Sequence, residues 1–83
     1  MNILVHDHAK HRMEERGTNE PEVFETVETG ERFPVKFGRV GFRKNFRYDE
    51  LWKGKRYSTK QVEVYAVEEN GGWMVITVLT KYF

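Results

Sequence analysis

The chain contains no cysteine and no long apolar run among its 83 residues. Without cysteine it can form neither disulfide bonds nor thiolate metal sites, and it lacks a cysteine nucleophile; this composition fits a reducing compartment. No window approaches the roughly 20 apolar residues of a membrane span, and the first residues lack the basic and apolar segments of a secretory leader. We therefore expect a cytoplasmic protein that does not use a membrane.

The length of the chain limits what it can enclose. A chain this short buries roughly 60–65% of its unfolded surface, which leaves little room for both a core and a cofactor pocket. We expect one domain over residues 1–83, with a shallow cleft and no cofactor.

Charge is nearly balanced overall, at +1, but it is uneven along the chain. Residues 1–30 carry three Lys/Arg against seven Asp/Glu, residues 31–60 carry ten against three, and residues 61–83 carry one against three. A basic middle between acidic flanks can present a one-sided positive surface, which favours polyanions such as nucleic acids. The alternative is that these basic residues form an ordinary solvated face.

Two apolar runs near the C-terminus, Val62–Val67 and Trp73–Leu79, are rich in β-branched and aromatic residues. The Asn70-Gly71-Gly72 segment between them supplies the positive φ angles of a tight turn, so the pattern predicts an antiparallel hairpin. The second run is apolar at nearly every position, which places it inside a sheet rather than at its edge.

Two helices are predicted in the N-terminal third. The first follows Asp7 as N-cap and ends at Gly17, and the second runs from about Glu20 to Thr29 after the capping residue Asn19. Before the first helix, Ile3–Val5 forms either a brief strand or the apolar lead-in to that helix.

From Phe33 onward the apolar period changes to two, which predicts strands around residues 33–37 and 40–46 with a turn near Gly38. Residues Arg47 to Ser58 are polar and aromatic, and we expect a long basic loop there. The expected fold is α+β, with two N-terminal helices packed on one face of a four-stranded, mostly antiparallel sheet. The other face of the sheet is then partly open, where a small protein can keep a substrate surface.

Three histidines, His6, His8 and His11, lie within six residues and suggest a metal site first. On a helix that begins at Asp7, however, His6 lies outside the helix, and no matching set of carboxylates or thiolates accompanies the other two. We therefore expect exposed or capping histidines and no bound metal.

The same helix carries His8, Arg12 and Arg16 in one row at intervals of four residues. A histidine near neutral pKa can shuttle protons, and two arginines can hold a phosphate. Cleavage of RNA through its own 2′-hydroxyl needs these groups and no metal. In the alternative interpretation His8 caps or packs, and the arginines pair with Glu15 or Glu20.

Basic residues and aromatic residues alternate through the middle of the chain. Cationic groups neutralise phosphates, and exposed aromatic rings stack on bases. Trp52 and Tyr57 either stack on bases or pin their own segment to the body of the protein. The Thr77 hydroxyl either belongs to a site or forms an ordinary hydrogen bond within the sheet. The candidate contacts to phosphate or RNA are Arg16, Arg43, Lys53, Lys55, Arg56 and Thr77. Four of them, residues 43 to 56, belong to a basic segment that also contains Arg39, Lys44, Arg47 and Lys60.

The segment His8–Gly17, with its His-Ala, Arg-Met and Glu-Arg-Gly pairs, resembles the opening of a family of small uncharacterised bacterial proteins. The segment Trp52–Tyr57, followed by Lys60 and later by Val75–Val78, is similar to the second half of that family. The family is grouped with RelE-like and BrnT-like toxins, within the barnase, EndoU, colicin and RelE arrangement of metal-independent ribonucleases. The chain departs from the family at Thr18, where an apolar residue is common.

This resemblance implies two N-terminal helices on a four-stranded antiparallel sheet, and RNA cleavage by basic and histidine side chains. The positions that match the family are His8, Arg12, Arg16, Lys60 and Thr77.

The leading hypothesis is a small RelE-like, toxin-type ribonuclease that cleaves RNA without a metal. In it His8 acts as general acid or base, Arg12 and Arg16 hold the scissile phosphate, and Lys60 stabilises the transition state. The expected partners are RNA, an antitoxin protein that covers the basic face, and a second copy of the chain that covers exposed strand edges. The alternative is a non-catalytic module that binds nucleic acid or a protein through the same basic segment.

Overall fold

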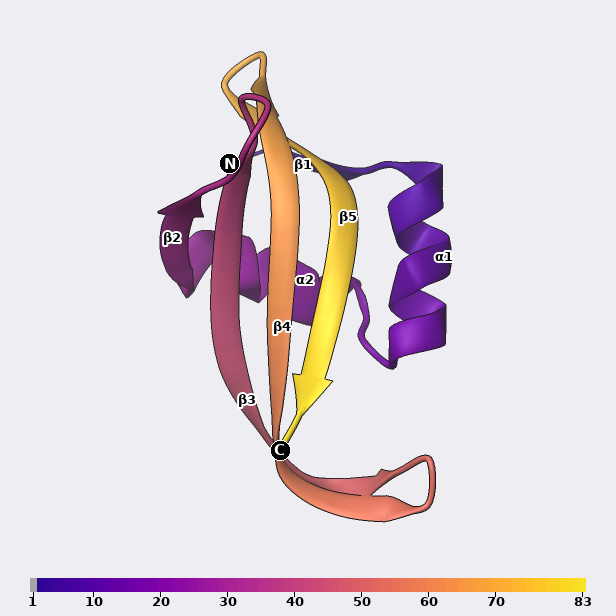
Figure 1. Ribbon diagram of the computed structural model, residues 1–83. Coiled ribbons are helices and arrows are strands. Elements are labelled where there is room, and N and C mark those ends of the chain that lie inside the picture. The colour runs from indigo at the N-terminus through magenta and orange to yellow at the C-terminus, as the bar shows by residue number, and fades with distance from the viewer. Residues whose placement is uncertain (1) are drawn as a thin grey trace.

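A mixed five-stranded sheet forms the centre of the computed structural model, which describes residues 2–83 (Figure 1). The elements are β1 (Ile3–Val5), α1 (Asp7–Arg16), α2 (Glu20–Thr29), β2 (Glu31–Pro34), β3 (Val40–Trp52), β4 (Lys55–Glu69) and β5 (Gly72–Tyr82). The strand order is β1-β5-β4-β3-β2, with β1 parallel to β5 and the other neighbours antiparallel. The α+β class and the two helices are confirmed.

The predicted count of four strands is wrong, because Ile3–Val5 forms a fifth strand, β1. A segment of three residues is too short to show a period, and β1 exists only through its pairing with Trp73–Val75 of β5. That pairing leaves β5 between β1 and β4, so the expectation of an interior strand is confirmed.

The expected loop at residues 47–58 is a second correction, because these residues form a paired β-ribbon that we call the hairpin arm. Lys53 and Gly54, both at positive φ, make its turn. A register shift between Arg47 and Glu50, where Asp49 has a φ of 50°, bends the arm. In Figure 1 the arm leaves the lower end of the sheet and curves towards the side on which α1 lies.

Aromatic stacking holds the hairpin arm to the body. The ring of Trp52 lies 4.6 Å from that of Tyr82 on β5 at an interplanar angle of 15°, and the rings of Tyr48 and Tyr57 also pack around Tyr82. An isolated two-stranded ribbon is only marginally stable in water, so these aromatic contacts fix the position of the arm.

The residues that begin and end the two helices are those expected from the local sequence, except at the start of α1. Gly17 ends α1 in the left-handed region, and the Asn19 side chain accepts the Glu22 N–H at the start of α2. At the start of α1, however, the N-cap is His6, whose Nδ1 accepts the His8 N–H, rather than the expected Asp7. Among the described residues, none of the helices is long and apolar enough to cross a membrane.

The core lies between the helices and one face of the sheet. Apolar side chains from α1 and α2 pack against β4 and β5, in Figure 1 with α2 crossing behind the sheet and α1 beside β5. The buried core residues of these elements are Ala9, Met13, Val23, Val27, Val62, Val64, Ala66, Trp73, Val75 and Val78. The helices thus occupy one face and leave the other to solvent.

The C-terminal end of α1 is bonded to the sheet by polar groups. The Arg16 carbonyl accepts hydrogen bonds from the hydroxyls of Thr80 (3.0 Å) and Tyr82 (2.6 Å), and the Lys60 ammonium donates to the Gly17 carbonyl at 2.9 Å. The Arg16 guanidinium donates in turn to the Val78 carbonyl. We call this set of contacts the helix–sheet joint.

Gly17→Ala should destabilise the fold far more than Gly54→Ala. A Cβ at Gly17 would lie 2.6 Å from both Trp52 Cζ3 and Tyr82 Oη, whereas a Cβ at Gly54 meets nothing within 4 Å. Both glycines have positive φ, so both variants carry the backbone strain of about 1–2 kcal/mol, and the clash adds about 1–3 kcal/mol at Gly17 alone. Urea unfolding measures the free energy of unfolding of both variants, and an equal loss of stability in the two would contradict the packing of the arm against α1.

Candidate functional site on the open sheet face

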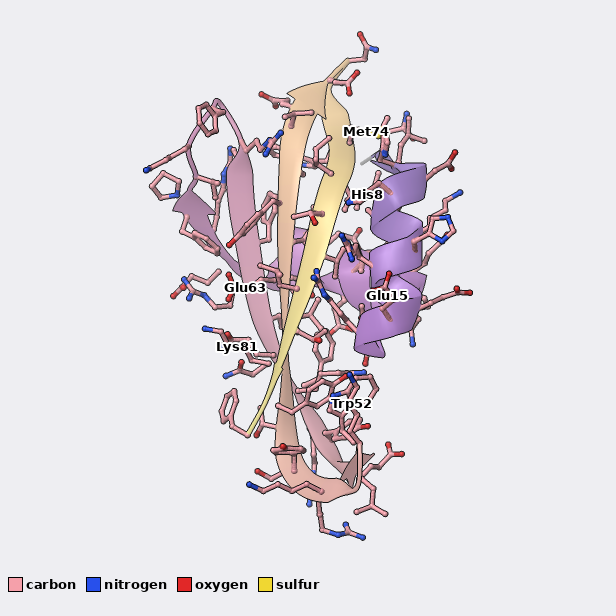
Figure 2. All side chains as sticks on the ribbon, turned by 45° about the vertical axis from the view of Figure 1, so that its right-hand side comes forward. His8, Glu15, Trp52, Glu63, Met74 and Lys81 are labelled. Carbon is pink, nitrogen blue, oxygen red and sulfur yellow. The ribbon has the colours of Figure 1, made fainter. Side chains whose placement is uncertain are left out.

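The structure distributes the residues predicted to act on RNA over separate parts of the molecule. His8 and Arg12 lie on the surface of α1, where His8 is exposed and Arg12 forms an ion pair with Glu15 at 3.3 Å. Figure 2 shows His8 and Glu15 on the α1 side of the sheet. In the described part of the chain, no group of three His, Cys, Asp or Glu side chains is arranged to hold a metal ion.

Arg16 and Lys60 belong to the helix–sheet joint. Lys60 is 6% exposed, and its Nζ lies 2.7 Å from Glu22 Oε1 and 2.9 Å from the Gly17 carbonyl. His8 lies nine residues before Gly17, so about 13 Å of helix axis separates it from this end of α1. The structure therefore does not bring His8 and Lys60 together.

Three of the predicted RNA-binding residues, Lys53, Lys55 and Arg56, are exposed at the tip of the hairpin arm. The Lys53 ammonium lies 5.5 Å from the Trp52 ring, and the Lys55 ammonium lies 5.5 Å from the Tyr57 ring. The two rings pack on Tyr82, so they anchor the arm, as the second of the two interpretations expected. The arm presents positive charge on a fixed ribbon.

The remaining two predicted residues, Arg43 and Thr77, lie on the face of the sheet that the helices leave open. Strand register places Glu63 of β4 opposite Arg43 of β3, and Tyr65 of β4 opposite Thr77 of β5. Side chains directly opposite each other share a face, and alternation along β4 puts Glu63 and Tyr65 on the side away from Val62 and Val64. Figure 2 shows Glu63 on the side of the sheet opposite α1, together with Lys81.

Glu63 is the centre of this group, which we call the open-face cluster: Arg43, Glu63, Tyr65 and Lys81. Although it lies on the open face, Glu63 is only 8% exposed because neighbouring side chains cover it. Its carboxylate accepts a hydrogen bond from the Tyr65 hydroxyl at 3.4 Å and lies 4.0 Å from the Lys81 ammonium. A buried carboxylate with two such long contacts retains capacity to accept another proton or hydrogen bond.

Arg43 lies opposite Glu63 on the neighbouring strand, and two residues of β2 fix its guanidinium. Its NH2 lies 3.1 Å from Glu31 Oε1, and its Cζ lies 4.4 Å from the centre of the Phe33 ring. The buried Nε of Arg43 has no hydrogen-bond partner among the described residues. Arg43 therefore offers one unused donor in a fixed position.

Tyr65 supplies a hydroxyl that stays protonated. Burial raises its pKa above the usual value of 10.0, the negative charge of Glu63 and its hydrogen bond raise it further, and Arg43 opposes the shift. At neutral pH the Tyr65 hydroxyl is therefore a hydrogen-bond and proton donor.

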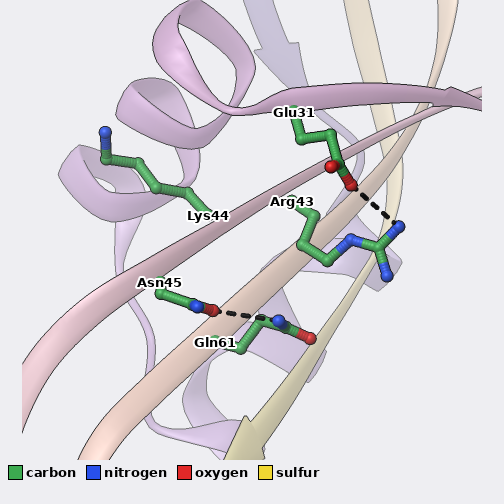
Figure 3. A pocket seen from close by; sticks show the side chains of 5 residues that line it. All are labelled: Glu31, Arg43, Lys44, Asn45 and Gln61. Carbon is green, nitrogen blue, oxygen red and sulfur yellow. Dashed lines mark hydrogen bonds and ion pairs between the residues drawn. The ribbon is translucent and has the colours of Figure 1, made fainter.

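A hollow of about 400 Å³ adjoins the open-face cluster (Figure 3). It is lined by Glu31, Arg43, Lys44, Asn45 and Gln61. The Gln61 amide donates to Asn45 Oδ1 at 2.9 Å, so these two side chains form a polar row one step along the strands from Arg43 and Glu63. The open face thus offers an acid–base pair, two cations and adjacent polar groups on one surface.

Sequence reasoning missed Glu63, Tyr65 and Lys81 as members of a site. One pattern does point to Glu63: it is the only charged residue inside the run Val62–Val67. A carboxylate within an alternating apolar strand must face either solvent or a partner. Two of its neighbours, however, come from other strands, Arg43 from β3 and Lys81 from β5, and only the strand register brings them together.

Comparison with known proteins gives a family without an assigned activity. The family model described as "Domain of unknown function (DUF4258)" matches residues 5–80. No curated protein and no solved structure matches the chain.

Glu22→Gln should destabilise the protein by about 2–4 kcal/mol, because it leaves the Lys60 ammonium buried without a counter-charge. Glu15→Gln on α1 breaks an exposed ion pair with Arg12 and should cost less than about 1 kcal/mol. Adding Lys60→Met to Glu22→Gln should restore part of the loss. Chemical denaturation measures all three, and a Glu22→Gln loss no larger than that of Glu15→Gln would show that the Lys60–Glu22 ion pair does not stabilise the fold.

Proposed function

We propose that this chain, which belongs to the family of the domain of unknown function DUF4258, is a metal-independent endoribonuclease that uses the open-face cluster. The observation that carries the proposal is the buried Glu63 carboxylate beside a protonated tyrosine and two cationic side chains. General acid–base catalysis of phosphodiester cleavage requires a proton acceptor, a proton donor and positive charge within reach of one phosphate.

The proposed reaction assigns one step to each group. Glu63 takes the proton of the 2′-hydroxyl, and the freed oxygen attacks the adjacent phosphorus. Arg43 and Lys81 stabilise the negative charge that develops on the phosphate oxygens. Tyr65 gives its proton to the departing 5′-oxygen, so the products are a 2′,3′-cyclic phosphate and a 5′-hydroxyl.

The contact between Tyr65 and Glu63 also completes the cycle. After cleavage Glu63 carries the proton of the 2′-hydroxyl and Tyr65 lacks one. A transfer across their 3.4 Å hydrogen bond restores both groups, so no external base is needed.

Charge and resemblance support RNA as the substrate. The segment 31–60 carries ten of the 14 Lys/Arg. They include Arg43 on the open face and Lys53, Lys55 and Arg56 on the hairpin arm, whereas Lys44 pairs with Glu25 of α2 and Lys60 belongs to the helix–sheet joint. The resemblance to RelE-like ribonucleases leads to the same substrate. If the chain is a toxin, its antitoxin is an acidic protein that covers Arg43 and Lys81. A second copy of the chain is a further expected partner, which would cover the exposed strand edges.

A second candidate is a non-catalytic module that binds nucleic acid through the hairpin arm. The observation in its favour is the exposed cationic tip formed by Lys53, Lys55 and Arg56 on a two-stranded ribbon. A ribbon of this kind fits a nucleic-acid groove, and its lysines and arginines contact phosphates. In this candidate the arm is required and Glu63 is not.

Glu63→Gln should lower cleavage of a fluorescent single-stranded RNA by about 10²–10⁴-fold in excess chelator, because the amide cannot accept the 2′-hydroxyl proton. The matched control is Glu69→Gln, which removes an exposed carboxylate from the same strand and should leave the rate unchanged. Denaturing gel electrophoresis measures the cleavage rate.

His8→Ala in the same assay separates the two possible locations of the catalytic groups. Full activity in His8→Ala together with loss in Glu63→Gln supports the open face. The reverse result would place catalysis on α1 and contradict the proposal, while binding without cleavage by the unaltered protein would leave the arm-based module.

A further inference from the structure

The turn between β2 and β3 holds an aromatic residue in a conformation that suits it poorly. Phe37 has a φ of 64° and is 88% exposed, and Gly38 after it also has a positive φ, of 70°. Two successive left-handed residues favour asparagine, aspartate or glycine at the first position, because a bulky side chain is strained there. Neither local conformation nor burial accounts for phenylalanine at this position.

The charges around Phe37 favour an anionic partner. Lys36 and Arg39 flank it, both are exposed, and in the described part of the chain neither forms an ion pair. The acidic residues at this end of the sheet are Glu68 and Glu69, the last two residues of β4. An exposed ring between two unpaired cations is the combination that stacks on a base while it contacts the neighbouring phosphates.

A hollow of about 300 Å³ lies at the base of this turn. Phe33, Pro34 and Val40 provide its apolar lining, and Arg32 and Arg39 provide the charges. The hollow is therefore apolar with cationic groups at its border, which suits a nucleobase attached to a phosphate.

Phe33 connects this hollow to the open-face cluster. Its ring lines the hollow, meets the ring of Tyr65 edge to face at 6.3 Å, and lies under the Arg43 guanidinium at 4.4 Å. Gly41 permits this packing, because a Cβ there would lie 2.4 Å from the Phe33 ring. In Figure 1 the β2–β3 turn and the hairpin arm lie at opposite ends of the sheet, with the strands running between them.

We propose that the β2–β3 turn is a subsite for an unpaired nucleotide of single-stranded RNA, with Phe37 stacked on the base and Lys36 and Arg39 on the flanking phosphates. This inference rests on the proposed function for its substrate, and it adds a position that binds one base outside the cleavage centre. Stacking accepts every base, so the subsite selects for unpaired RNA rather than for sequence.

Phe37→Asn tests the subsite with two readouts. Asparagine tolerates positive φ, so the thermal midpoint should rise, whereas the dissociation constant for a 2′-O-methyl single-stranded oligonucleotide should increase on the order of tenfold. The 2′-O-methyl groups block cleavage, so fluorescence anisotropy reports binding alone. Leu4→Asn is the control, because it changes another exposed apolar residue, on β1 at the opposite edge of the sheet, and should leave affinity unchanged.

The result separates this inference from the proposed function. Unchanged affinity in Phe37→Asn, a lower thermal midpoint, or an equal loss of affinity for a blunt RNA duplex would each overturn the subsite. Phe37→Trp should keep the affinity of the unaltered protein. Normal cleavage by Glu63→Gln together with weaker binding by Phe37→Asn would overturn the catalytic proposal and keep the subsite, and a protein that binds no RNA would overturn both.

Discussion

The arrangement of the molecule depends on the buried ammonium of Lys60. The ammonium of a lysine that is only 6% exposed must be paired, and here Glu22 at the start of α2 and the Gly17 carbonyl at the end of α1 provide the partners. One side chain on β4 thus fixes both helix ends to the sheet. Tyr82 extends this constraint to the hairpin arm, because its hydroxyl bonds the Arg16 carbonyl while its ring stacks on Trp52. The helices, the sheet and the arm are therefore positioned by a single group of contacts.

This constraint determines which face of the sheet is free for chemistry. Lys60 and Glu63 are three residues apart on β4, so they point to opposite faces: Lys60 into the helix–sheet joint and Glu63 away from it. Arg16 and Lys60 were predicted to act on RNA, and in the structure both hold α1 in place. Packing therefore gives these two side chains a role of their own, whereas the open-face cluster lies on the other face of the sheet.

The parts of the fold that follow from local chemistry were predictable from the sequence. The glycine at the end of α1, the Asn19 cap and the Asn70-Gly71 turn each act within a few residues. The N-cap of α1 is a local exception, since His6 takes the place of Asp7. The two larger errors depend on distant partners: β1 exists through β5, and the hairpin arm exists through pairing and through Tyr82. Arg43 was recognised from its charge, whereas Glu63 was not, because its importance lies in burial and in neighbours from other strands.

The recessed position of Glu63 has a consequence for the substrate under the proposed mechanism. The carboxylate lies beneath exposed side chains such as Lys81, whose side chain is 69% exposed against 10% for Glu63. A 2′-hydroxyl must therefore descend to the carboxylate while the phosphate stays at the level of the cations. A flexible single strand can turn its sugar in this way, whereas an A-form duplex holds its 2′-hydroxyls along a wide, shallow groove. Access to Glu63 and stacking on Phe37 thus select for the same feature, an unpaired strand, through independent groups, one on the open face and one in the β2–β3 turn.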